Sequence, residues 1–251
     1  MKKNLTILLC ILVSFCQAQT LKVSYLEKIN LSDTSKIDMS KQFEESGLSP
    51  AMEAILQKAI EDEARKISQG KEYELYSLNG ESIYQKTKSE EIVNNNITTT
   101  IIDQIDIFYR NFKDKKTTNQ TSILSKTFLI HEDETDFNWQ ISSETQVIAG
   151  YKCKKATSSF EPGLEAWFTN EVPINAGPKT YNGLPGLIIK VNSEYLAIEA
   201  TDVEVSDNPI KIKVPSKGKK VSRKKFNEIR DKKENRNKDN EGSISIKVIQ
   251  M

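Results

Sequence analysis

Residues 71–84 read KEYELYSLNGESIY and carry the clearest fold signal in the chain. Tyr73 and Leu75 alternate with polar residues, and apolar residues resume at Ile83. Between the two runs stands Asn79-Gly80, the dipeptide that favours a two-residue hairpin turn because both residues accept a positive φ. The stretch therefore predicts an antiparallel β-hairpin.

The same alternation continues on both sides of this hairpin. Before it, Leu21, Val23 and Tyr25 share one face of an expected strand. After it, turn signals recur about every ten residues, and Thr, Ser, Lys and Glu fill the outward positions, as in antiparallel sheets with one solvated face. Further strands are expected at 97–102, 105–112, 121–131, 138–148, 151–160, 164–169, 187–192 and 195–205.

One helix is expected ahead of the hairpin. Ser49-Pro50 are N-cap and first-turn residues, and apolar residues follow at helical spacing from Met52 to Ile67. We predict an amphipathic helix over 50–68 that packs on the sheet, because an open sheet alone leaves an apolar face uncovered. The predicted class is mainly β (α+β), with a curved antiparallel sheet, sandwich or partly open barrel.

The first residues have the pattern of a targeting segment. Lys2 precedes an apolar run over 5–15, which is shorter than the roughly 20 residues that span a bilayer. The pattern predicts a secretory signal peptide at 1–18, cleaved after its last residue. A lipoprotein signal is the rival interpretation, but the residues before Cys10 and Cys16 are bulky. We therefore expect an exported protein.

Charge divides the rest of the chain. The whole sequence has 36 basic and 35 acidic residues, but Lys211–Lys238 contains 13 Lys or Arg against three acidic residues. Without the signal peptide and this run, the remaining charge is −11. We predict a β-rich domain at 19–210 and a basic, partly helical or mobile tail at 211–251. The tail is either solvated or rests on an anionic membrane surface. Nucleic acid is not an expected partner.

Few residues offer catalytic or metal-binding chemistry. After cleavage Cys153 is the sole cysteine, so no intramolecular disulfide forms. We expect it to be a buried strand residue, with a reactive thiol as the alternative. His131, the single histidine, precedes an acidic run, and no nucleophile elbow or phosphate-binding loop is present. We therefore assign no catalytic, cofactor-binding or metal-ligating residue.

A second stretch is more specific than any single strand. Residues 183–188 are Gly183, Leu184, Pro185, Gly186, Leu187 and Ile188, and upstream stand Trp139, Gly150-Tyr151-x-Cys153 and Gly177-Pro178. In these residues the chain resembles the GLPGLI family, over about residues 100–205. The resemblance implies an exported protein of the Gram-negative envelope, periplasmic or associated with the outer membrane. It implies no catalytic residue, since the family has no established activity.

The hexapeptide also has a physical interpretation. Pro185-Gly186 is typical of a type II turn, in which Gly takes the positive φ. Together with Pro173 and Pro178 it predicts a stiff loop that pins Leu184 into the core. The alternative is a fixed lip of a ligand or partner site.

That lip would be lined by Trp167, Tyr181 and Leu184.

Two functions remain open from sequence. The first is a non-catalytic envelope protein that binds a protein partner or an apolar ligand, which predicts an aromatic pocket without convergent polar groups. The second is a carboxylate-based hydrolase, which predicts two acidic residues in one cleft with shifted pKa values. The lack of catalytic motifs favours the first.

Overall fold

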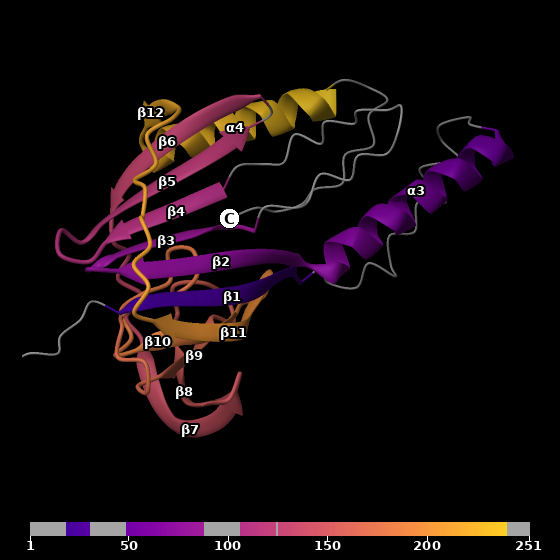
Figure 1. Ribbon diagram of the computed structural model, residues 1–251. Coiled ribbons are helices and arrows are strands. Elements are labelled where there is room, and N and C mark those ends of the chain that lie inside the picture. The colour runs from indigo at the N-terminus through magenta and orange to yellow at the C-terminus, as the bar shows by residue number, and fades with distance from the viewer. Residues whose placement is uncertain (1–18, 31–48, 88–105, 124, 240–251) are drawn as a thin grey trace, which may run out of the picture.

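A computed structural model of the chain describes residues 19–30, 49–87, 106–123 and 125–239. The predicted signal peptide and the predicted strand at 97–102 lie outside these residues. The described strands form one sheet (Figure 1). They are β1 (Thr20–Ile29), β2 (Lys71–Leu78), β3 (Glu81–Lys86), β4 (Asp106–Asn111), β5 (Lys116–Ile123), β6 (Lys126–Asp133), β7 (Gln140–Ile148), β8 (Tyr151–Thr157), β9 (Glu165–Thr169), β10 (Leu187–Asn192), β11 (Leu196–Ser206) and β12 (Lys219–Val221).

The sheet consists of two meanders joined by β1. Its strand order is β12-β6-β5-β4-β3-β2-β1-β11-β10-β9-β8-β7, so β1 pairs with β2 on one side and β11 on the other. All neighbours are antiparallel except β12 and β6. The order has two ends, and Figure 1 shows a curved, open sheet. The mainly β class and the curvature are confirmed, but the sheet is mixed rather than purely antiparallel.

The opening hairpin forms as its sequence indicates. β2 and β3 pair from Leu78 and Glu81 outward, and the turn residues Asn79 and Gly80 have φ values of 53° and 79°. The prediction of one continuous strand at 121–131 is wrong, because the stretch belongs to two strands, β5 and β6. The chain reverses there, since Ile123 of β5 pairs with Lys126 of β6. No Gly, Pro or Asn marks this turn, so composition gave no signal for it.

The two described helices relate differently to the sheet. The helix α3 (Pro50–Gln69) is directed away from it in Figure 1, and Met52 and Ile55 are 51% and 66% exposed. The predicted packing of an N-terminal helix on the sheet is therefore not supported. The helix α4 (Arg223–Asp239) packs instead, because Phe226 is buried against Phe128 of β6. No helix in the described residues is long and apolar enough to cross a membrane.

The main core lies beneath a long segment without regular secondary structure, residues 170–186, which we call the 170–186 loop. Burial of apolar area from both meanders is the main stabilising term here. Because β1 is central, its residues contact the loop and both halves of the sheet. Fully buried members include Leu21, Val23, Tyr25, Leu75, Phe168, Leu184, Leu187, Ile189 and Ile198.

Candidate functional site

The 170–186 loop is held to the sheet through main-chain hydrogen bonds. The amide N–H groups of Leu187 and Ile188 donate to the carbonyls of Val172 (3.1 Å) and Ala176 (2.9 Å). The carbonyl of Ile188 accepts a hydrogen bond of 2.6 Å from the Tyr25 hydroxyl. A bulge after Ile188 frees that carbonyl from the ladder with β9. The loop is thus fixed at the start of β10.

Two glycines allow the chain to approach itself closely. A Cβ on Gly177 would lie 2.6 Å from the Tyr181 carbonyl oxygen, and one on Gly186 would lie 2.1 Å from the Thr169 carbonyl oxygen. The φ of Gly186 is 153°, and its positive sign agrees with the prediction for this glycine. The predicted type II turn does not form, because the Gly186 N–H donates to Leu184 O two residues back (2.8 Å). The turn is tighter, and Gly186 lies directly against β9.

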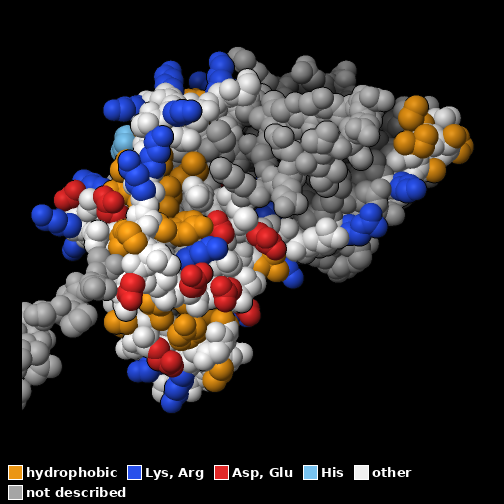
Figure 2. Space-filling view, in the orientation of Figure 1, with side chains coloured by type: hydrophobic (Ala, Val, Ile, Leu, Met, Phe, Trp, Pro, Cys, Tyr) orange, Lys and Arg blue, Asp and Glu red, His pale blue; other side chains and the backbone are white. Residues whose placement is uncertain are grey.

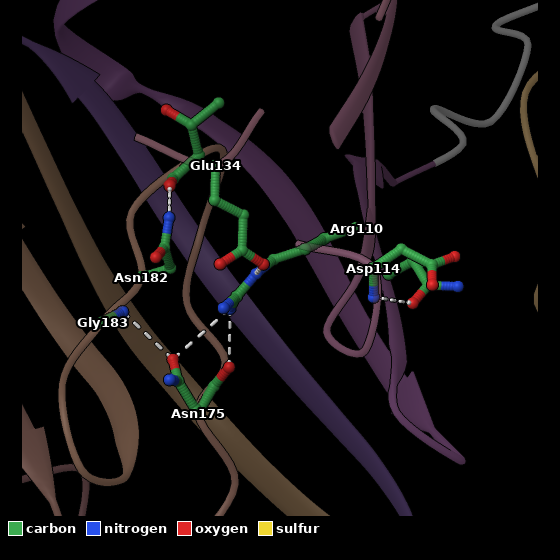
Figure 3. A network of polar contacts seen from close by, with 8 residues as sticks. Arg110, Asp114, Glu134, Asn175, Asn182 and Gly183 are labelled. Atoms are coloured by element: carbon green, nitrogen blue, oxygen red, sulfur yellow. Dashed lines mark hydrogen bonds and ion pairs between the residues drawn. The ribbon is translucent and has the colours of Figure 1, made fainter. Parts of the chain in front are cut away.

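A polar network ties the loop to the other meander (Figure 3). Nη1 of Arg110, on β4, donates to the main-chain oxygen of Asn175 at 2.7 Å. The Oδ1 of Asn175 accepts from the N–H of Gly183 at 3.1 Å. On its other side Arg110 forms an ion pair with Glu134, and these two side chains are only 9% and 13% exposed. The pair therefore supports the hexapeptide from a strand distant in sequence.

A pocket of about 420 Å³ lies beside the hexapeptide. The segment between β6 and β7 forms one wall, and the end of the 170–186 loop forms the other. The lining residues are Lys115, Glu134, Thr135, Asp136, Phe137, Trp139, Ile141, Asn182, Gly183 and Leu184. We call this site the Trp139 pocket. Its walls combine aromatic and apolar groups with a few charged ones.

Trp139 is held in one orientation. Its indole Nε1 donates to the Asn182 carbonyl at 2.7 Å, and its ring stacks on Phe137 with centroids 5.3 Å apart. Gly183 lies beside the ring, where a Cβ would be 3.6 Å from the indole Cδ1. Since Phe137 also packs on Tyr181 at 5.3 Å, the aromatic wall continues into the core. The pocket therefore has a preformed aromatic side.

The structure separates the three residues predicted to line a lip. Leu184 lines the Trp139 pocket and is 1% exposed. Tyr181 is buried behind Phe137, and its hydroxyl donates to Glu161 (3.2 Å). Trp167 lies on β9, where the Lys155 ammonium approaches its ring.

Sequence reasoning noted Trp139 but gave it no role, and it missed Phe137, Ile141 and the Arg110 network. A signal was available for one of these residues. Trp139 is one of only two tryptophans, and it directly precedes an exposed strand.

A second cluster of charged groups lies on the sheet near Lys179. The Lys179 ammonium is 2.9 Å from a Glu27 carboxylate oxygen, and the Tyr84 hydroxyl donates to Glu27 at 3.2 Å. Burial raises the pKa of Asp106 to about 6, Lys179 acting against that rise and Glu27 adding to it. Asn119 is buried, and its Oδ1 has no hydrogen-bond partner among the described residues. Asp106 is thus a carboxyl group with a shifted pKa outside the pocket.

The remaining candidate residues have structural roles. Cys153 is fully buried on β8, as expected, and burial raises the pKa of its thiol to about 11, which disfavours a reactive thiolate. His131 is exposed on β6, with Nδ1 3.0 Å from the Thr118 hydroxyl oxygen. Across the residues the structure describes, no three His, Cys, Asp or Glu side chains are grouped as metal ligands would be.

Comparison with known proteins finds a family match over a short region and a similar fold. A family described as "Protein of unknown function (Porph_ging)" matches residues 160–190, which include the hexapeptide and the whole 170–186 loop. No curated protein matches the chain. Two solved structures of PNGF-II, in P21 and C2 space groups, are each 16% identical to it, with TM-scores of 0.51 and 0.48.

The match to those structures is partial. It covers 84% of this chain but 33% and 32% of the PNGF-II chains, so this chain spans about a third of their length. At this identity the P21 structure indicates a similar fold and carries no activity across.

Proposed function

We propose that this protein is an exported, non-catalytic binding protein of the cell envelope, of the GLPGLI type, located in the periplasm or at the outer membrane. Its Trp139 pocket takes an apolar group of a protein partner or of a small ligand. The observation that carries this proposal is the aromatic wall of Trp139 and Phe137, fixed against the hexapeptide. A volume near 420 Å³ is within the roughly 300–1,000 Å³ typical of ligand pockets.

Both carboxylates that line this pocket make contacts within the protein. Glu134 is paired with Arg110, and Asp136 accepts a hydrogen bond of 3.0 Å from the Asn138 N–H. Neither group is therefore arranged as a general acid or base. Ile141, which is 51% exposed at the start of β7, offers a ligand an apolar contact beside the aromatic wall. An exposed apolar side chain next to a fixed aromatic wall favours binding over catalysis.

Native mass spectrometry tests this proposal. The full chain is purified without denaturation from the cells that produce it, as wild type and as two variants. Ile141→Lys places a charge in the Trp139 pocket. Val147→Lys is the matched control, because Val147 lies on the same strand, is 69% exposed and does not line the pocket.

We expect an added ligand or partner mass on the wild type and on Val147→Lys, and its loss from Ile141→Lys. A bare mass for the wild type, or equal loading of both variants, contradicts the proposal.

One observation favours a carboxylate-based hydrolase as the second candidate. Asp106 has a raised pKa and lies near the carboxylate of Glu27. Glu27 is neutralised by Lys179, however, which leaves Asp106 without a free second carboxylate. Hydrolysis of chromogenic glycosides and esters by the wild type, with its loss in Asp106→Asn, would support this candidate. No turnover by the wild type contradicts it.

A further inference from the structure

The basic run after β11 is held to the sheet from Lys217 onward. The main-chain N–H of Lys217 donates to Gln120 Oε1 on β5 at 3.2 Å. At Gly218, where φ is 122°, a Cβ would lie 2.9 Å from the Phe128 carbonyl carbon, so the chain contacts β6 directly. Lys219–Val221 then pairs with β6 as the strand β12. The segment is an ordered layer on the sheet.

The start of α4 continues this ordered layer. The Ser222 hydroxyl accepts from the Lys225 N–H at 3.2 Å, which caps the helix. Phe226 packs edge-on against Phe128, with ring centroids 5.5 Å apart. The Arg223 guanidinium is 2.9 Å from Glu132 of β6. The helix therefore begins at a fixed place beside β12.

This arrangement exposes lysines on a rigid support. Within the described part of the chain, no ion pair joins Lys219, Lys220 or Lys224 to a carboxylate. Figure 2 shows blue side chains gathered over the region where Figure 1 places β12. We define the basic surface as the exposed residues Lys211, Lys213, Lys217, Lys219, Lys220 and Lys224.

We propose that the basic surface docks on an anionic lipid bilayer. Ammonium groups held near such a membrane are attracted by its negative surface potential. Since the main chain that carries Lys217, Lys219 and Lys220 is already held on the sheet, docking costs little backbone entropy. The rest of the mature chain carries a charge of −11, so repulsion turns it away from the membrane. This inference is independent of the Trp139 pocket.

The residues around these lysines are better suited to contact a lipid bilayer than to bind nucleic acid. Val214 is 47% exposed between Lys213 and Lys217, where an apolar side chain can enter the headgroup boundary. No aromatic residue occurs from 211 to 225, so stacking on bases has no platform there. A basic stretch with an exposed apolar residue is the pattern of a peripheral membrane contact.

Vesicle co-sedimentation tests the inference on the full chain. The vesicles contain phosphatidylglycerol and phosphatidylcholine in equal parts, with phosphatidylcholine alone for comparison. The test variant removes three charges, as Lys219→Gln, Lys220→Gln and Lys224→Gln. The matched control removes three exposed charges elsewhere on the sheet, as Lys71→Gln, Lys152→Gln and Lys154→Gln.

We expect binding to the anionic vesicles only, weakened at least about tenfold in the test variant and little changed in the control. High salt should abolish the binding, because it screens the charges. Equal weakening in both variants, or no vesicle binding by the wild type, overturns the inference. So does binding to a soluble polyanion such as DNA without binding to vesicles.

Discussion

The indole Nε1 of Trp139 donates a 2.7 Å hydrogen bond to the main-chain carbonyl of Asn182, immediately before the hexapeptide. This one contact joins the segment that enters β7 to the 170–186 loop. It fixes the aromatic side of the pocket and satisfies a carbonyl in a buried residue. The Trp139 pocket and the hexapeptide therefore depend on each other.

Removing this hydrogen bond should lower stability. Trp139→Phe keeps an aromatic ring but leaves the Asn182 carbonyl without its donor. We expect the free energy of unfolding to fall by about 1–2 kcal/mol, as for other buried groups that lose a partner. Urea denaturation measures the difference. An unchanged midpoint would show that water replaces the indole without cost.

Gly186 should tolerate no side chain. Gly186→Ala places a methyl group 2.1 Å from the Thr169 carbonyl oxygen, so β9 and β10 must separate. We expect a loss of about 3 kcal/mol or more, from backbone strain together with the clash.

Gly150→Ala is the control, because φ there is 83° but no atom of the described residues lies within 4 Å of the added Cβ. It should cost only about 1 kcal/mol, from the positive φ alone. Equal losses in the two variants, measured by urea denaturation, would contradict the close approach of Gly186 to β9.

The ion pair between Arg110 and Glu134 should matter more than its exposed neighbour. Arg110→Met leaves the Glu134 carboxylate and the Asn175 carbonyl without their donor, and we expect a loss of about 3 kcal/mol. Lys116→Met breaks an exposed pair with Asp133 and should cost less than about 1 kcal/mol. Thermal unfolding of both variants tests the ranking, and the reverse order would refute it.

Asp106 should make stability depend on pH in a defined direction. Its pKa is about 6 in the folded chain and 3.8 as the ordinary value, so the folded state holds the proton more tightly. The contribution of the Asp106 carboxyl to the free energy of unfolding is fully present below pH 4 and is lost as the pH rises through 6. Asp106→Asn abolishes this pH-dependent loss, because the amide does not titrate.

We expect the Asp106→Asn variant to be more stable than wild type at pH 7, by about 2 kcal/mol. The difference should shrink as the pH falls from 6 to 4, measured by urea unfolding at each pH. A constant difference across this range would show that the Asp106 carboxyl does not titrate as described.

Local patterns gave much of the fold. The hairpin at 71–84 forms because its alternation and its Asn-Gly turn act over a few residues. Ser222 likewise caps α4 through a contact three residues away. Periodicity indicates that a helix has an apolar face but does not say what that face packs on. The helix that packs on the sheet is therefore α4, through Phe226, and not the N-terminal helix.

The candidate site was harder to predict, because it depends on contacts between distant residues. Arg110 and Asn175 are separated by 65 positions, and no local pattern joins them. Leu184 was predicted on the lip because it belongs to the hexapeptide. The opposite wall comes from the segment before β7, whose position depends on the order of strands in the sheet. Sequence alone does not specify that order.

Photo-crosslinking at the pocket tests the central claim most directly. The photoreactive residue p-benzoylphenylalanine replaces Ile141 in the pocket or, as a control, Val205 on β11, which is 42% exposed and does not line the pocket. Both proteins are irradiated in the cells that produce them, and adducts are resolved by mass. A discrete adduct at position 141 that is absent at position 205 is the predicted result. No adduct at 141, or the same adducts at both positions, would contradict a binding function for the Trp139 pocket.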